Sequence, residues 1–280
     1  MDYCSKAELM VCCFSREIRN EDFLVQGIAT PLVSASYILA NLTHAPDLLV
    51  LYVVGNTLVR KGGTLSFSNY EQLTIGNAIK RVSFVDISCE LLPALTPKEF
   101  FRPAQVDRWG NFNNVVIGKY NHPIVRLPGA AGISDVTTFY PKFYLYVPRH
   151  DKRTFVDKID FVSGIGRLSK VNANKKDSIV RGTGPLKIFT DFCVMGLGEE
   201  GMTILSLHPG VQLKDVEDNT GFKLQISPDL KETPLPSKQE LSLLRNKIDP
   251  LGTRELELLP KKQRWRKIKE ILKRENLKKL

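Results

Sequence analysis

The sequence has few of the residues that build metal centres or disulfide frameworks. Its five cysteines form no C-x-x-C pair, and none of its four histidines lies three or four residues from another His or Cys. This spacing lacks the common zinc motifs and predicts free, buried thiols in a reducing compartment. The cysteines are Cys4, Cys12, Cys13, Cys89 and Cys193. We therefore expect no metal and no bound cofactor.

The chain also lacks an uninterrupted apolar stretch long enough to span a membrane. The longest apolar run near the N-terminus, residues 23–42, is broken by polar residues, a glycine and a proline. No signal peptide precedes it. We expect a soluble, cytoplasmic protein without integral membrane contact.

Positive charge is nearly balanced in the body of the chain and concentrated at its end. The formal net charge is +10, but residues 261–280 hold ten Lys and Arg against two Glu. A nearly neutral body is not typical of a nucleic-acid-binding domain, so we expect no specific nucleic-acid partner. We predict one domain over residues 1–255, followed by a basic amphipathic tail over residues 256–280.

The tail contains an apolar helical face formed by Trp265, Ile268 and Leu272. Such a face suits docking on the protein's own surface or a solvated cap. It also suits an anionic membrane surface or an acidic partner. The sequence alone leaves these alternatives open.

Hydrophobic patterns predict helices alternating with strands in the first half and mainly strands after residue 105. Helices are expected over 6–18 and 31–42, and the apolar run 47–54 is typical of a parallel strand covered on both faces. Capping-box patterns predict helix starts at Thr96 and Ser237. Further strands are expected at 81–88, 114–120, 123–127, 142–148, 186–196 and 202–210. This order predicts an α/β layered fold with a mixed, mainly parallel sheet.

Two glycine-containing stretches are candidate loops. RLPGAAGISD, residues 126–135 (the glycine loop), is almost all backbone. Such a loop either forms an ordinary tight turn or exposes main-chain N–H groups to a phosphate or an oxyanion. The polar stretch 165–184 is expected to be a long exposed loop.

Eight short motifs follow one another along the chain. They are LTHAPDL (42–48), QVDRWGNFN (105–113), RLPGAAGISD (126–135), RTFVDKIDFVSGIG (153–166), IFTDFCVM (188–195), LSLHPGV (205–211), DNTGF (218–222) and DPLG (249–252). In this order they resemble the beta subunits of family I CoA-transferases, particularly the glutaconate CoA-transferase type. The resemblance implies a CoA-transferase/ribose-phosphate-isomerase-like fold. It also implies an alpha subunit of similar fold in an α2β2 assembly, and an acyl-CoA thioester as substrate.

The resemblance also implies a catalytic glutamate that this chain lacks. In transferases of the family, a beta-chain glutamate attacks the thioester and carries CoA covalently. It is expected just after the LTHAPDL strand, where this chain has Val53 and Val54. No Asp or Glu occurs between Asp47 and Glu71. We therefore expect that the standard transferase mechanism does not operate from this position.

Residues that contact CoA or the substrate are implied in two of the motifs. The candidates are Gly129, Ala130, Ala131, Gly132, Asp135, Gln105 and Arg126. In the glycine loop, Ala131 replaces a family glycine and Ser134 an asparagine, so the binding mode is expected to differ. A plain turn is the alternative explanation for the loop, and a surface or interface ion pair is the alternative for Arg126.

Other polar residues are expected to be structural. Asp107 and Asn111 lie in a turn-forming sequence, and His44 is expected to cap or pack at a helix end. His208 and Asp191 are expected to form structural hydrogen bonds.

The favoured function is the beta subunit of a heteromeric enzyme that acts on an acyl-CoA thioester by hydrolysis or ring opening. The catalytic carboxylate would then come from the alpha subunit. The alternatives are a true CoA-transferase with an unexpected nucleophile, a non-catalytic scaffold subunit, and an RNA- or membrane-surface-binding protein that uses the tail.

Overall fold

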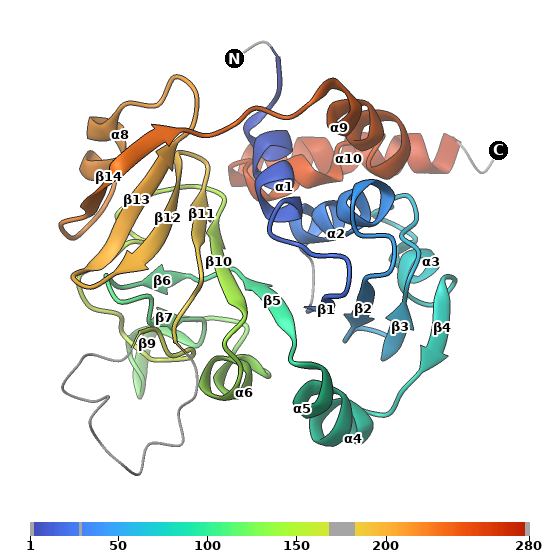
Figure 1. The fold of residues 1–280 in the computed structure, drawn as a ribbon, viewed down its shortest axis with the longest axis horizontal. Helices are drawn as coiled ribbons and strands as arrows, with labels where there is room; N and C mark the ends of the chain where they lie inside the picture. Colours follow the sequence, from blue (N-terminus) through green and yellow to red (C-terminus); the bar gives the residue numbers. More distant parts are fainter. Residues whose placement is uncertain (1–2, 28–29, 168–182, 278–280) are drawn as a thin grey trace. The chain divides into compact units, whose positions relative to one another are not determined.

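The computed structural model describes residues 3–27, 30–167 and 183–277 (Figure 1). The chain divides into two compact units. Unit 1 comprises Met1–Lys98 with Pro234–Leu280, and unit 2 comprises Glu99–Thr233. Most of the predicted loop at 165–184 lies outside the described residues. In the described ranges, no helix is long and apolar enough to cross a membrane.

The strands of the described residues form a ten-stranded sheet and two small two-stranded sheets. In the large sheet, β1·β2, β5·β10, β10·β11 and β13·β14 are parallel, whereas β2·β3, β3·β4, β11·β12 and β12·β13 are antiparallel. The predicted α/β class with a mixed sheet is confirmed. The large sheet contains β1 (Phe23–Gln26), β2 (Leu49–Tyr52), β3 (Thr57–Val59), β4 (Ala78–Arg81), β5 (Lys98–Phe101), β10 (Phe143–Val147), β11 (Ile188–Thr190), β12 (Cys193–Gly198), β13 (Gly201–Leu207) and β14 (Gln225–Glu232). The small sheets pair β6 (Gln105–Val106) with β7 (Phe112–Asn113), and β8 (Val116–Lys119) with β9 (His122–Arg126).

The helices of unit 1 begin with the two that the apolar spacing predicts, α1 and α2. A capping box between Ser5 and Glu8 starts α1, and Pro31 occupies the first turn of α2. The capping box at Ser237 likewise starts α9, as predicted. The helices of this unit are α1 (Lys6–Ser15), α2 (Pro31–Thr43), α3 (Tyr70–Thr74), α4 (Phe84–Asp86), η1 (Ile87–Leu91), α5 (Leu92–Leu95), α9 (Lys238–Leu243), η2 (Leu244–Ile248), η3 (Thr253–Glu257) and α10 (Lys261–Leu277).

Two local predictions were wrong. The segment 81–88 is not a strand, because Ser83 and Asp86 form a capping box that starts the helical segment α4–η1. The predicted helix start at Thr96 is instead a residue with φ 50°, followed by strand β5. Lys98–Phe101 pairs with β10, so tertiary strand pairing overrides the local capping signal.

A buried ion-pair network links α1 to the C-terminal segment of unit 1. Glu8 accepts hydrogen bonds from Arg254 at 2.9 Å and Arg245 at 2.7 Å, and Arg254 also pairs with Asp249 at 2.9 Å. Burial favours the neutral acid, but hydrogen bonds from Arg245 and the Ser5 backbone, with the arginine charges, lower the pKa of Glu8 to about 2. The DPLG motif, which begins at Asp249, therefore has a structural role here.

The basic tail packs on unit 1. Ile271 of α10 is fully buried against Leu251 and Leu256. The Glu275 carboxylate accepts hydrogen bonds from the Ser66 hydroxyl and from the backbone of the next two residues, at 2.6–2.9 Å. Docking on the protein's own surface, one of the alternatives left open by the sequence, thus involves Ile271 and the partly buried Ile268 of the predicted face, whereas Trp265 is 58 % exposed.

The core of unit 2 is a large aromatic and aliphatic cluster. Phe101, Phe112 and Phe143 pack with ring centroids 5.7–6.4 Å apart. Helices α6 (Ile133–Phe139) and α8 (Leu213–Asp218) add Val136 and Val216 to this cluster. The core anchors β7, and β7 leads directly into the β8–β9 hairpin and the glycine loop.

Candidate functional site

The turn after β2 is the position where the resemblance places a glutamate. Strands β1 and β2 are parallel, with Gln26 opposite Tyr52, and the Val53 backbone N–H donates to the Gln26 carbonyl at 3.1 Å. The carboxyl ends of parallel strands are the usual edge for ligand binding in α/β sheets. The turn itself uses left-handed backbone at Gly55 (φ 103°) and Asn56 (φ 52°).

The two valines of this turn differ in their surroundings. Val53 is half-buried and packs against a cluster that includes Phe23 and Leu51. Val54 is 40 % exposed. Neither side chain can act as a nucleophile, base or hydrogen-bond partner. Of the two, Val54 is therefore the position from which a longer side chain would reach solvent.

The glycine loop follows β9 in unit 2 and leads into α6. Its first part is tied down, because Leu127 and Gly129 donate backbone hydrogen bonds to Val115 and Asn114 at 3.0 and 2.9 Å. Within the described residues, the next three backbone N–H groups donate no hydrogen bond. They belong to Ala130, Ala131 and Gly132. The loop therefore presents a run of unengaged donors, as an anion- or oxyanion-binding loop requires.

Backbone conformation and space distinguish the residues of this loop. Gly129 has φ 110° and Ala131 φ 44°, so an alanine occupies a conformation that favours glycine. A Cβ added at Gly129 or Gly132 would meet no atom of the described chain within 4 Å, and Gly132 has an ordinary φ of −82°. Gly132 is the N-cap residue of α6, a position where glycine is common, so the plain-turn interpretation explains it as well as a ligand contact does.

Arg126 belongs to an exposed aromatic stack on the β8–β9 hairpin. Its guanidinium lies 4.6 Å from the centre of the Tyr120 ring and donates to the Tyr120 carbonyl at 2.7 Å. Tyr120 in turn stacks on Phe161 at 5.7 Å. Asp135 is exposed in the first turn of α6. Arg126 and Asp135, the first and last residues of the glycine loop, are therefore both exposed to solvent. Their contacts with CoA remain predictions.

Gln105 is buried and engaged at both ends of its amide. Nε2 donates to Asp160 Oδ2 at 2.9 Å, and Oε1 accepts from Asn113 Nδ2 at 2.8 Å. Asp160 Oδ2 also accepts the backbone N–H of Gly118 in β8 at 2.9 Å. The contacts of Gln105 thus hold β7, β8 and Asp160 together. Through this segment Gln105 positions the hairpin that precedes the glycine loop.

The residues expected to be structural have structural partners. Asp107 accepts hydrogen bonds from the backbone of Trp109 and Asn111 and from the Asn111 side chain, at 2.8–3.0 Å. His44 contacts the carbonyl of Ser15, the last residue of α1, and that of Ile18, and Asp191 accepts the backbone N–H of His150 at 2.8 Å. The expected structural roles of these side chains are confirmed.

Two histidines of unit 2, His150 and His208, are buried. His208 contacts Thr233 Oγ1 and the Thr190 carbonyl, both at 2.9 Å, as a structural histidine would. Sequence reasoning missed the other, His150, which stacks on Phe155 at 4.1 Å and contacts Thr220 Oγ1 at 2.9 Å. Burial lowers the pKa of His150 to about 3, so it stays neutral. No sequence motif surrounds His150 that would have indicated this.

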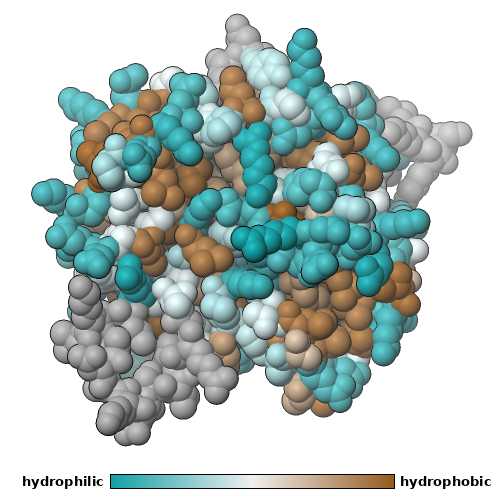
Figure 2. All heavy atoms as spheres, viewed as in Figure 1, coloured by the Kyte–Doolittle hydropathy of each residue, from teal (hydrophilic) through white to brown (hydrophobic). Residues whose placement is uncertain are grey.

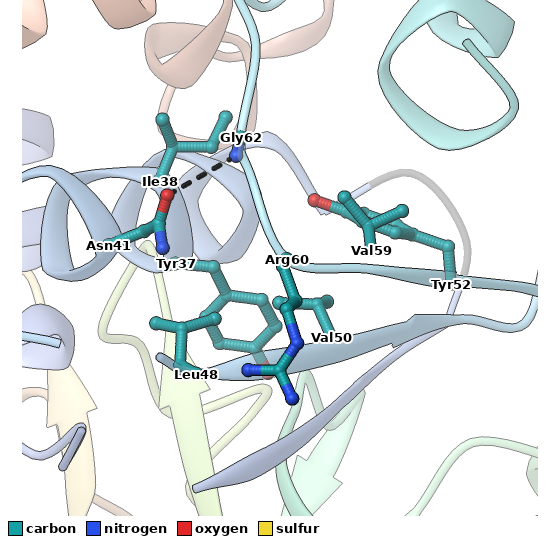
Figure 3. Close-up of a pocket in the computed structure, with 9 residues that line it drawn as sticks. All are labelled: Tyr37, Ile38, Asn41, Leu48, Val50, Tyr52, Val59, Arg60 and Gly62. Carbon is teal, nitrogen blue, oxygen red and sulfur yellow. Dashed lines mark hydrogen bonds between the residues drawn. The ribbon is translucent and has the colours of Figure 1, made fainter. Parts of the chain in front are cut away.

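Unit 1 also contains a small pocket between α2 and β2 (Figure 3). Two of its polar groups are engaged: Asn41 accepts the Gly62 backbone N–H at 3.4 Å, and Arg60 donates to the Asp47 carbonyl at 2.9 Å. The remaining lining is mainly aliphatic and aromatic.

Comparison with known proteins places these observations in a family. The coenzyme A transferase family matches residues 13–219. The chain is 33% identical to the B subunit of the 3-oxoadipate CoA-transferase of Pseudomonas knackmussii over 244 residues, which cover 86% of this chain and 92% of that protein. It is 28% identical to the B subunit of the glutaconate CoA-transferase of Acidaminococcus fermentans, with 87% and 92% covered.

Other matches have different activities in their names. The cholesterol ring-cleaving hydrolase IpdB subunit of Mycobacterium tuberculosis is 35% identical over 156 residues, which cover 55% of this chain and 61% of that protein. The crystal structure of the decarboxylase AibA/AibB superposes with a TM-score of 0.77 at 27% identity, covering 90% of this chain and 97% of that chain. The resemblance inferred from the eight motifs is thus confirmed.

Proposed function

The chain belongs to the coenzyme A transferase family, and we propose that its enzyme cleaves an acyl-CoA substrate hydrolytically, with the catalytic carboxylate supplied by the partner subunit. The chain is a B-type subunit of a heteromeric enzyme of this family. What supports the proposal is the turn after β2, where the resemblance places the family glutamate and this chain has Val53 and Val54. A covalent glutamyl-CoA intermediate has no residue to form on there.

The glycine loop supplies the group that this chain contributes to the reaction. Its open N–H groups at Ala130, Ala131 and Gly132 suit a carbonyl oxygen that becomes negatively charged. The partner's carboxylate removes a proton from water, and the water oxygen bonds to the carbonyl carbon. Collapse of the adduct then breaks the bond to the leaving group, which takes up the proton.

Intact-mass spectrometry tests this proposal. The purified complex is incubated with acyl-CoA, quenched, and the mass of each chain measured. We expect this chain to remain unmodified, because general-base hydrolysis leaves no covalent mark. Addition of the mass of CoA to this chain, mapped to any Asp or Glu, would restore the transferase mechanism.

Two other reactions are compatible with particular relatives. CoA transfer is favoured by the 33% identity with a 3-oxoadipate CoA-transferase chain over most of both proteins. Decarboxylation is favoured by the structural match to AibA/AibB. A product assay separates the three: free CoA indicates hydrolysis of the thioester, exchange of CoA between acids indicates transfer, and released CO2 indicates decarboxylation.

We also propose that an A-type subunit covers apolar surface on unit 1, in an α2β2 assembly. Large apolar side chains are exposed on and beside β4, α4 and α5, where hydrophobic residues gather on the face seen in Figure 2. They are Ile75, Ile79, Phe84, Val85 and Leu95. Patches of this kind mark protein interaction sites. Expressed alone, the chain should be inactive, and with its partner it should purify in equal amounts; full activity of a verified monomer would contradict this.

A further inference from the structure

A cluster of uncharged polar side chains lies at the carboxyl end of β1 in unit 1. It consists of Gln26, which ends β1, Thr30 and Ser34 at the start of α2, and Tyr70, the first residue of α3. We call it the Gln26 cluster. Gln26 is 1 % exposed and Ser34 is fully buried, whereas Tyr70 is half-buried and therefore borders solvent.

The Gln26 amide has hydrogen-bond partners at its nitrogen but none at its oxygen. Its Nε2 lies 2.9 Å from Thr30 Oγ1 and 3.1 Å from the Tyr70 hydroxyl, and it also contacts Ser34 Oγ. Its Oε1 is buried and has no hydrogen-bond partner among the described residues. Because hydroxyl groups both donate and accept, turning the amide by 180° would leave its other end unpaired instead.

A buried polar atom without a partner costs about 1–3 kcal/mol and is uncommon in folded proteins. Its place in the fold offers a reason. The Gln26 carbonyl accepts the N–H of Val53, so Gln26 is hydrogen-bonded to the turn where the resemblance places the reactive group.

We propose that the Gln26 cluster binds a neutral oxygen on the acyl chain of the thioester substrate: either a hydroxyl that donates to Gln26 Oε1 or, with the amide turned, a keto oxygen that accepts from Nε2. This inference rests on the proposed function only in taking an acyl-CoA as the ligand. The cluster contains no cationic side chain that would select a carboxylate. Burial raises the pKa of Tyr70, so its phenol stays protonated.

Isothermal titration calorimetry with two probes tests the inference. The full-length chain, purified with its A-type subunit, is titrated with 3-oxohexanoyl-CoA and with hexanoyl-CoA. Gln26→Leu should weaken binding of the 3-oxo probe about tenfold and change binding of hexanoyl-CoA less than about twofold. Tyr70→Phe should act in the same direction with a smaller effect.

Ser36→Ala is the matched control. Ser36 lies two residues after Ser34 in α2 and is equally buried, but its hydroxyl donates to the Val33 carbonyl at 2.8 Å, outside the Gln26 cluster. This variant should bind both probes like the wild type. Thermal melting gives a second readout. Leucine removes the unpaired Oε1 but also the hydrogen bonds of Nε2, so the melting temperature shows whether weaker binding by Gln26→Leu accompanies a less stable fold.

Several outcomes would overturn the inference. These are unchanged binding of the 3-oxo probe, equal weakening of both probes, and failure of the wild type to bind either. If Gln26→Leu does not assemble, Tyr70→Phe decides by the same criterion. If the wild type binds the 3-oxo probe and Gln26→Leu weakens only that binding, but no hydrolysis occurs, the proposed hydrolytic function would be wrong and the inference about the Gln26 cluster would stand.

Discussion

The turn after β2 and the glycine loop are both built on left-handed backbone, yet substitution has affected them differently. At the turn, the backbone is left-handed at Gly55 and Asn56, and valines stand where the resemblance places a reactive side chain. In the proposed function the glycine loop contributes backbone N–H groups, and Ala131 has such a group as glycine does. A function that depends on a side chain requires one residue type, whereas a function of the backbone is compatible with several.

The largest expected effect follows from crowding the glycine loop. Gly132→Val places a branched side chain where a Cβ meets no atom of the described chain within 4 Å, so the fold should tolerate it. If the loop N–H groups contact the substrate, kcat/KM of the assembled enzyme should fall about a hundredfold, the order of effect of losing one oxyanion donor. Unchanged kinetics in a variant that assembles normally would favour the plain-turn interpretation.

The next effect tests the two valines of the turn against each other. Val53→Glu inserts a carboxylate beside Phe23 and Leu51 and should lower the free energy of unfolding by about 2 kcal/mol at pH 7. Val54→Glu should cost much less, because Val54 is 40 % exposed. Chemical denaturation of both variants measures the difference.

The pH dependence of this pair follows from the sign of the pKa shift. Burial would raise the pKa of a glutamate at position 53, so its destabilising effect should shrink as the pH falls and the carboxyl becomes protonated. Equal stability of the two variants at pH 7 would contradict the placement of Val53. Weak formation of a CoA adduct by Val54→Glu, seen in its intact mass, would sharpen the contrast with the wild-type turn.

The smallest effect concerns backbone strain in the glycine loop. Ala131 has φ 44°, so Ala131→Gly should relieve strain and stabilise the protein by up to about 1 kcal/mol. Gly129→Ala is the reciprocal control: Gly129 has φ 110°, and alanine there should destabilise although space is available. Melting temperatures that move in the same direction for both variants would rule out this account.

Local residue patterns were sufficient where a helix or strand is stabilised by its own neighbours. The apolar spacing of α1 and α2 and the capping box at Ser237 predicted helices that are present. The pattern failed at Thr96, where pairing with β10 overrides the capping signal and forms β5. Long-range hydrogen bonds are not visible in a short window of sequence.

For the candidate site, the sequence pointed to the glycine loop and to the valines after β2, but not to the hydrogen bonds that each group makes. The sequence did not indicate that the Gln105 amide is engaged with Asp160 and Asn113, and its contact with CoA stays a prediction. The unpaired amide of Gln26 could not have been predicted, because it depends on residues eight and forty-four positions away.

The sequence by itself determined the family, the fold class, the absence of a carboxylate between Asp47 and Glu71, and the small residues of the glycine loop, since these are properties of residue identity and order. Only the tertiary structure decided which N–H groups of that loop are unengaged, which valine is exposed, and that α10 is docked through Ile271 and Glu275. The physical reason is that hydrogen-bond satisfaction and burial depend on atoms brought together by folding, often from distant parts of the chain.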